Sequence, residues 1–126
     1  MATTAQLLQD SLLLIWNDRD ASKRLAAMQR VYDPSIQFYE HNAGEAIVGH
    51  QAINELISRL QAEWPADFLF TLSQPAQANH QVQHAAWALG KPGAPPAATG
   101  VDIALVENGL IKALYLLLDA SAAEAA

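Results

Sequence analysis

The C-terminal part of the chain decides the fold, and its residues 101–118 read VDIALVENGLIKALYLLL. Asn108-Gly109 in the middle of this stretch favours a two-residue hairpin turn, because both residues tolerate the left-handed backbone that such a turn requires. We therefore predict two antiparallel strands, at 101–107 and 110–118. In the second strand apolar side chains fall on both faces, whereas a strand buried on one side only would alternate. We expect its outer face to pack against a second copy of the protein; an exposed apolar face is the alternative.

Upstream of this hairpin the apolar residues also recur with a period of two, which is typical of strands. We predict strands at 68–72 and 82–89, separated by Pro75 and by a turn near 78–80. The segment 90–100 contains three prolines and three glycines, which predicts a flexible loop. The last four strands should then form an antiparallel meander.

In the first half of the chain the apolar period is 3.6, as in amphipathic helices. It predicts one helix that ends at about residue 17, a second over about 20–32, and a third over 50–63. Asp33 precedes a proline and ends the second helix, because such a residue avoids the helical conformation; a strand follows at 36–41. Helices first and strands after indicate an α+β fold with three helices packed on a curved, mostly antiparallel sheet.

Length, charge and composition exclude several classes of protein. The 126 residues suffice for one domain, which we place at 1–120, followed by a disordered tail at 121–126. A net charge of −6 argues against a nucleic-acid or membrane partner, and no apolar stretch is long enough to span a bilayer. Cysteine is absent, and His80 and His84 lie too far apart along a strand to share a metal ion. We expect a cytoplasmic protein without metal or cofactor.

Several short motifs give the chain a family resemblance. They are Tyr32-Asp33-Pro34, Phe38-x-Glu40, Gly49-His50-x-Ala52-Ile53, Gly100-x-Asp102 and Glu107-Asn108-Gly109-x-Ile111. With these motifs the chain resembles the SnoaL-like branch of the nuclear transport factor 2-like superfamily, from about residue 7 to 119. The resemblance implies a cone-shaped, cystatin-like fold around an apolar pocket. This branch includes isomerases, cyclases, dehydratases, epoxide hydrolases and binding modules, so the fold alone does not define the activity.

Ketosteroid isomerases are distant relatives in this superfamily, and three of their functional positions can be carried over by spacing. Their oxyanion-binding tyrosine falls on Trp16, counted back from Tyr32. Their catalytic base, an aspartate, falls on Glu40, and their oxyanion-hole aspartic acid falls on Asp102. The resemblance thus implies that Asp102 is an acid and Glu40 a base, whereas the indole at position 16 is a weaker acid than the phenol that it replaces.

The residues themselves support part of this assignment. Strand alternation places Asp102 on the same face as Ala104, a small neighbour that leaves room for a ligand. A carboxyl among apolar groups is hard to ionise and can donate a proton near neutral pH, while Glu40, nearer a strand end, could accept one. In the alternative interpretation Asp102 pairs with His84 or Tyr115, and Glu40 is an exposed end of a strand.

The other pocket candidates are mostly apolar or aromatic. We predict that a small apolar ligand contacts Trp16, Tyr32, Phe38, Leu56, Leu60, Phe70, His84 and Tyr115. His84 and Trp87 are three apart along one strand and must lie on opposite faces. We favour His84 in the pocket and Trp87 on the contact between subunits of a homodimer; the reverse register would make Trp87 a platform for the ligand.

Three functions fit these features. The first is a cofactor-free enzyme that isomerises, cyclises or dehydrates a small apolar carbonyl or polycyclic compound. The second is a non-catalytic protein that binds a small hydrophobic ligand, and the third is an interaction module that pairs through its sheet. If Glu40 and Asp102 face one cavity of a few hundred Å³, the enzyme is favoured; if aromatic side chains fill that cavity, the interaction module is favoured.

Overall fold

A computed structural model of the chain describes residues 5–40 and 44–119, so the predicted tail lies outside the described residues. The described elements follow the predicted order of two helices, a strand, a third helix and then the remaining strands. The helical elements are α1 (Gln6–Asp10), the π-helical segment η1 (Ser11–Trp16), α2 (Ala21–Val31) and α3 (His50–Glu63). The strands are β1 (Tyr32–Tyr39), β2 (Ile47–Val48), β3 (Leu69–Leu72), β4 (Gln77–Asn79), β5 (Val82–Gly90), β6 (Ala98–Glu107) and β7 (Leu110–Leu118).

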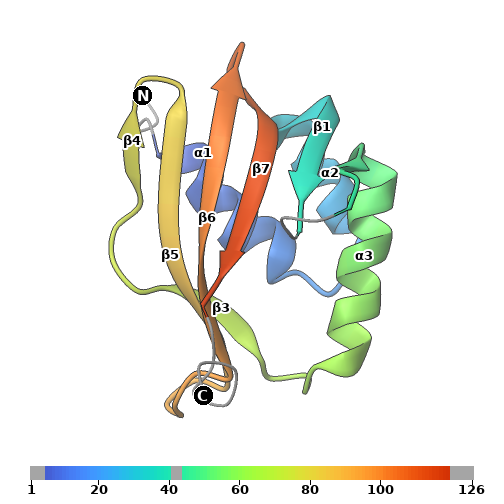
Figure 1. Ribbon diagram of the computed structural model, residues 1–126. Helices are drawn as coiled ribbons and strands as arrows, with labels where there is room; N and C mark the ends of the chain where they lie inside the picture. The colour runs from blue at the N-terminus through green and yellow to red at the C-terminus, as the bar shows by residue number, and fades with distance from the viewer. Residues whose placement is uncertain (1–4, 41–43, 120–126) are drawn as a thin grey trace.

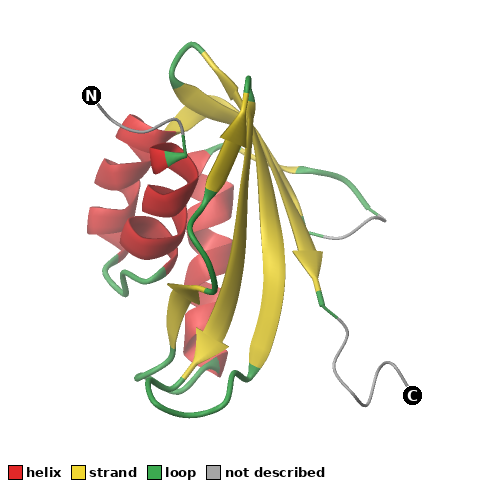
Figure 2. Ribbon diagram, turned by 90° about the vertical axis from the view of Figure 1, so that its left-hand side faces the viewer, coloured by secondary structure: helices red, strands yellow, loops and turns green. Residues whose placement is uncertain are grey.

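The strands form one curved sheet in the order β2-β1-β7-β6-β5-β3, with β4 paired to β5 (Figure 1). All neighbours are antiparallel except β1 and β7, which run parallel. The helices cover one face of the sheet, and the opposite face carries no helix (Figure 2). The predicted α+β architecture, three helices on a curved and mostly antiparallel sheet, is confirmed.

The turn at the centre of the decisive stretch is formed as predicted. Asn108 and Gly109 have φ angles of +53° and +80°, the left-handed region that a tight hairpin turn requires. The turn fixes the pairing of β6 with β7, in which Asp102 lies opposite Leu116. On its other side Asp102 lies opposite Ala85 of β5, so these three residues share the inner, helix-covered face of the sheet.

Three parts of the chain differ from the prediction. β6 begins at Ala98 and not at residue 101, so the loop is shorter than the predicted 90–100. β1 begins at Tyr32, directly after α2, and not at residue 36. Tyr32 is already extended and pairs with Ile111 of β7, and an irregularity in register before Gln37 accommodates the Asp33-Pro34 step. The region near residue 78, predicted as a turn, forms the short strand β4, because Ala78 and its neighbours pair with the start of β5.

The N-terminal helix is not uniform either. It changes from α-helical to π-helical at Ser11, and a π-helical turn is wider than an α-helical one. Leu12, Ile15 and Trp16 of this segment are all buried against the sheet. Asp20 then caps α2, since its side chain accepts hydrogen bonds from the first backbone N–H groups of that helix, as expected for an N-terminal aspartate.

A buried arginine joins α2 to α3. Arg24 is 1% exposed, and its guanidinium donates to the side chains of Asn54, Ser58 and Gln61 and to the carbonyl of Asp18. These hydrogen bonds compensate for removing the cation from water. The polar cluster therefore fixes how the two helices lie relative to each other beneath the sheet.

The outer face of the sheet is largely apolar and free of helices. Among its side chains Val82, Leu105 and Leu117 are 39%, 37% and 55% exposed. Tyr39 of β1 and Tyr115 of β7 stack in parallel on this face with ring centroids 4.8 Å apart. Within the described residues no helix is long and apolar enough to cross a membrane.

Candidate functional site

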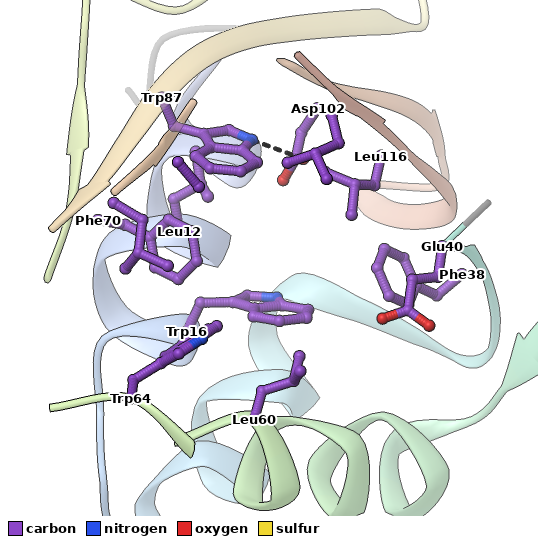
Figure 3. Close-up of a pocket in the computed structure, with 13 residues that line it drawn as sticks. Leu12, Trp16, Phe38, Glu40, Leu60, Trp64, Phe70, Trp87, Asp102 and Leu116 are labelled. Carbon is purple, nitrogen blue, oxygen red and sulfur yellow. Dashed lines mark hydrogen bonds between the residues drawn. The ribbon is translucent and has the colours of Figure 1, made fainter. Parts of the chain in front are cut away.

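A cavity of about 230 Å³ lies between the helices and the inner face of the sheet. Its lining is apolar apart from two carboxyl groups, those of Glu40 and Asp102 (Figure 3). Glu40 directly follows β1 and Asp102 lies in β6, so the fold brings together residues that are 62 positions apart in the sequence. The complete lining is Leu12, Trp16, Phe38, Glu40, Leu60, Trp64, Phe70, Trp87, Leu89, Ala98, Asp102, Leu116 and Leu118.

Asp102 lies in the middle of β6 with its side chain on the inner face, 5% exposed. Burial raises the pKa of its carboxyl to about 7, and a hydrogen bond from Trp87 opposes that rise. The indole Nε1–H of Trp87 donates to Oδ1 of Asp102 at 3.0 Å (Figure 3). Near neutral pH both the protonated and the ionised form of this carboxyl are therefore populated.

The second oxygen of the same carboxyl faces the cavity. Oδ2 of Asp102 has no hydrogen-bond partner among the described residues. Every fully buried side-chain oxygen or nitrogen of these residues does have one, so Oδ2 is not fully buried. It therefore reaches the open space of the cavity that Asp102 lines. The predicted inward direction of Asp102 is therefore observed, while its partner is neither His84 nor Tyr115 but Trp87.

Glu40 follows the last residue of β1 and is half-buried at the edge of the same cavity. In Figure 3 its carboxylate points inward, past Phe38 and toward the space in front of Trp16. The position agrees with the predicted strand end, and it gives the cavity a second oxygen acceptor that is less buried than Asp102.

Trp16 lines the cavity but does not offer it a hydrogen-bond donor. Its Nε1–H donates to the hydroxyl of Tyr32 at 3.2 Å, and that hydroxyl is also 2.6 Å from the hydroxyl of Ser11. Tyr32 is fully buried behind Trp16, and burial raises the pKa of its phenol. The donor role that the resemblance placed at residue 16 is thus absent, because the indole N–H already has a partner inside the core.

Besides Tyr32, three more of the residues that we predicted to contact the ligand do not line the cavity. Leu56 is buried in the core one turn before Leu60 and does not line the cavity. His84 and Tyr115 both pair with Ile103 of β6 and lie on the outer face of the sheet. In contrast, Trp16, Phe38, Leu60 and Phe70 line the cavity as expected.

The prediction for β5 is reversed, because Trp87 and not His84 lies on the inner face. Trp87 is 4% exposed and packs edge to face against Phe70, with ring centroids 5.2 Å apart. Its strand partner is Gly100, where a β-carbon would approach the indole to 2.5 Å. The absence of a side chain at Gly100 therefore makes room for the large ring, which is the signal that could have placed Trp87 from the sequence.

Several further lining residues were not predicted. Trp64 packs edge to face against Phe70 at 5.7 Å and extends the aromatic wall beyond α3. Leu12 comes from η1. The other four lie on strands and follow from the inward position of Asp102, since residues that are paired across strands or displaced by an even number along a strand share a face. They are Leu89, Ala98, Leu116 and Leu118.

The described residues contain no group of three or more His, Cys, Asp or Glu side chains that could bind a metal ion. His84 lies on the outer face, and His50 at the start of α3 contacts the backbone carbonyls of Tyr32 and Asp33. The ionisable groups in the lining of the cavity are the two carboxyls of Glu40 and Asp102.

Comparisons with known proteins place the fold. No model of a known protein family matches the sequence, and no curated protein matches it. Among solved structures, one assigned as an isomerase of the SnoaL-like family from Agrobacterium tumefaciens is 19% identical, with a TM-score of 0.81 over 94% of this chain and 100% of that one. One assigned as a SnoaL-like polyketide cyclase from Jannaschia is 12% identical, with a TM-score of 0.73 over 92% and 85% of the two chains.

A third similar structure is a protein with a ketosteroid isomerase-like fold from Catenulispora acidiphila in complex with trimethylamine. It is 14% identical, with a TM-score of 0.71 over 97% of this chain and 90% of that one. A cystatin-fold protein from Novosphingobium aromaticivorans also matches, with a TM-score of 0.68. The chain therefore has the cystatin-like, nuclear transport factor 2-like fold, and in this fold it resembles structures assigned to the SnoaL-like branch.

Proposed function

We propose that this protein is a cofactor-free enzyme that transfers protons on a small apolar carbonyl compound, as isomerases, cyclases and dehydratases do. The observation that carries the proposal is a carboxyl with a pKa of about 7 in an apolar cavity that also contains a second carboxyl. Two carboxyl groups in different environments can act as an acid and a base at the same pH. Asp102 is the acid in this proposal, and Glu40 or a water molecule is the base.

The proposed step is the conversion of a ketone into its enol. The base removes a proton from the carbon next to the carbonyl group, and the electron pair of that C–H bond shifts to form a carbon–carbon double bond. The carbonyl π electrons move to the oxygen, where Oδ2 of Asp102 donates a hydrogen bond or the proton itself. A donor placed where the negative charge develops stabilises the transition state more than the ground state.

The size of the cavity supports a compact substrate. A cavity of about 150 Å³ in another protein binds benzene, and the cavity here measures about 230 Å³. One or two rings therefore fit inside, and a larger polycyclic compound would extend past the exposed side chain of Leu118 at the rim. The similar structure that contains trimethylamine supports the capacity of this fold to bind a small organic molecule.

A non-catalytic binding protein is the second candidate, and one observation favours it. The Nε1–H groups of Trp16 and Trp87 are bonded to Tyr32 and Asp102, so the proposed oxyanion site has Asp102 as its donor and lacks the donor expected at residue 16. A site with one donor gains less transition-state stabilisation than a site with two. Such a cavity can still bind an apolar ligand by burying its surface.

Exchange of hydrogen for deuterium next to the carbonyl of 1-tetralone distinguishes the two candidates. We expect the wild-type protein to accelerate this exchange in D2O, measured by NMR, and to do so better at pH 6 than at pH 8, because Asp102 loses its proton between them. Asp102→Asn and Glu40→Gln should each slow the exchange at least tenfold. Glu107→Gln, a change of an exposed carboxylate on the same strand as Asp102, serves as the matched control and should have no effect.

Three results bear on the proposal in different ways. If 1-tetralone binds but its exchange is not accelerated, the protein is a binding protein. If the Asp102→Asn variant exchanges as fast as the wild type, Asp102 is not part of the mechanism. If neither 1-tetralone nor its hydrocarbon counterpart tetralin binds, the cavity does not take a compound of this class.

We further propose that the outer face of the sheet joins two copies of the chain. In the middle of this face β5, β6 and β7 present uncharged side chains, among them Ala86, Ile103 and Leu117, whereas Glu107 and Lys112 lie toward the turn that joins β6 to β7. Two copies that each carry a charge of −6 can meet on such a face without opposing like charges. Ile103, in the middle of the face, would lie near the centre of the contact.

Sedimentation velocity tests the dimer. We expect the wild type to sediment as a dimer and Ile103→Glu to sediment as a monomer, because a carboxylate would have to be desolvated within the contact. Gln51→Glu places the same charge on the exposed surface of α3 and should leave the dimer intact. A wild-type protein that remains monomeric at micromolar concentrations would contradict this proposal.

A further inference from the structure

The hydrogen bond between Trp87 and Asp102 has chemical consequences beyond the stability of the core. An indole N–H can only donate, so Oδ1 of Asp102 must accept. In a neutral carboxyl group the carbonyl oxygen is the better acceptor and the hydroxyl oxygen carries the proton. The proton of the neutral acid therefore belongs on Oδ2, the oxygen that reaches the cavity.

The indole ring is held firmly enough to direct this bond. Phe70 packs edge to face against it at an interplanar angle of 80°, and Gly100, the partner of Trp87 on β6, lies beside the ring. A β-carbon at residue 100 would lie 2.5 Å from Cζ2 of Trp87 and 2.9 Å from the carbonyl oxygen of Leu117. The ring is thus confined between a neighbouring ring and a strand, and its N–H points along the sheet toward Asp102 (Figure 3).

The same bond also acts on the ionised form of Asp102. A hydrogen bond to a carboxylate is charge-assisted and stronger than a bond to the neutral acid, so it lowers the pKa that burial raises. Among the described residues that line the cavity, Glu40 is the other titratable group, and Tyr32 lies behind Trp16. His84 is on the far side of the sheet and does not face Asp102.

We infer that Trp87 is a positioning residue, which fixes the proton of Asp102 on the oxygen that faces the cavity and so makes the site selective for ligands with an acceptor oxygen. The inference rests on the proposed function in that Asp102 is the donor to the ligand. It specifies the class of ligand further: a neutral compound whose carbonyl oxygen lies on the sheet side of the cavity, next to β6. An anionic compound is disfavoured, because Glu40 and the ionised form of Asp102 would repel it.

NMR of the protein without ligand tests the role of Trp87. In protein labelled with ¹³C at the aspartate side-chain carboxyl, we expect the resonance that disappears in Asp102→Asn to titrate with a midpoint near 7. Trp87→Phe keeps an aromatic ring but removes the donor, and it should raise this midpoint by about one pH unit. Trp64→Phe makes the same chemical change elsewhere in the lining of the cavity and should shift it by less than about 0.3 units.

A measurement on the unmodified protein covers the case in which the Trp87→Phe variant does not fold. The indole N–H resonance of Trp87, assigned through a ¹⁵N spectrum, should move with the same midpoint as the carboxyl of Asp102, because the acceptor becomes charged. The indole resonance of Trp16, which donates to the hydroxyl of Tyr32, should move less. If the resonance of Trp87 does not follow the titration, the inference is wrong whatever the variants do.

Ligand selectivity gives the last readout, with 1-tetralone and tetralin as a pair that differs by one carbonyl oxygen. At pH 6 the wild type should bind the ketone at least fivefold more tightly than the hydrocarbon, and Trp87→Phe should reduce this ratio toward one while both compounds still bind. An unchanged ratio, or an unchanged midpoint of Asp102, would overturn the inference. Neither result affects the hydrogen–deuterium exchange that tests the proposed function, so the failure of one is distinguishable from the failure of the other.

Discussion

Asp102 occupies the centre of a strand, where aspartate is uncommon, and its environment has a measurable cost. The pKa of its carboxyl is about 7 in the folded protein, whereas the usual value for aspartate is 3.8. Between these two values the folded state binds more protons than the unfolded state, so the free energy of unfolding decreases as pH rises. The contribution is fully present below pH 3.8 and is lost once the pH exceeds about 7.

Asp102→Asn should remove this dependence. We expect the wild type to lose stability relative to the variant as the pH is raised from 4 to 8, by up to about 4 kcal/mol. Urea denaturation of both proteins at four pH values measures the difference, in which other titrating groups cancel. A difference that is constant across this range would mean that the carboxyl is not desolvated in the folded state.

Arg24 is a second buried residue with a charged side chain, and its role can be tested separately from that of Asp102. Arg24→Leu leaves the side-chain oxygens of Asn54 and Gln61 without their donor, and unsatisfied buried acceptors are costly. We expect the variant to lose about 3 kcal/mol of unfolding free energy. Arg30→Leu makes the same change on the exposed part of α2 and should cost less than about 0.5 kcal/mol. Equal losses in the two variants would contradict the structural role of Arg24.

Strand pairing positions the residues that line the cavity, and the pair of Gly100 with Trp87 leaves no room for a larger side chain at residue 100. Gly100→Ala should destabilise the fold by about 2 kcal/mol, because the added methyl group overlaps the indole of Trp87. In a Trp87→Phe background the smaller ring lacks the overlapping atom, and the same substitution should cost at least about 1 kcal/mol less. A double-mutant cycle by thermal denaturation measures this coupling. Strict additivity would show that the two positions do not compete for space.

The elements that the sequence predicts well are those with local signals. The turn at Asn108-Gly109 and the helix over 50–63 depend on neighbouring residues, and the structure confirms both. The inward position of Asp102 also follows from alternation along one strand. For β5, alternation alone does not decide whether His84 or Trp87 faces the helices. Our prediction of His84 was wrong, because the contact that decides it, between Trp87 and Gly100, involves another strand.

Other features depend on contacts between distant residues and have no local signature. Trp16 lines the cavity as predicted, but only the three-dimensional structure reveals that Tyr32 lies in the core and that its hydroxyl accepts from Trp16. The parallel pairing of β1 with β7 joins strands more than seventy residues apart, which no period in the sequence encodes. The sequence therefore predicted both acids of the candidate site and four of the apolar residues that line it, but not its hydrogen bonds.

At the scale of the whole molecule, one face of the sheet is covered by helices and the other is apolar and bare (Figure 2). If two copies pair through that face, folding and association are linked. The midpoint of thermal unfolding should then rise with protein concentration, by several degrees between 1 and 100 μM, as expected for a dimer that dissociates on unfolding. The Ile103→Glu variant should unfold at a lower temperature that does not depend on concentration. Differential scanning calorimetry at three concentrations checks both statements.

The parallel pairing of β1 with β7 has a consequence for how the chain reaches its native state. Its partner strand β7 follows β1 by more than seventy residues, and β7 is also the neighbour of β6. Contacts of such long sequence separation slow folding, because a large loop must close before they form. We therefore expect the inner side of β1 and the helices before it to stay partly uncovered until β7 has been synthesised, and in this interval the nascent protein needs most protection from aggregation.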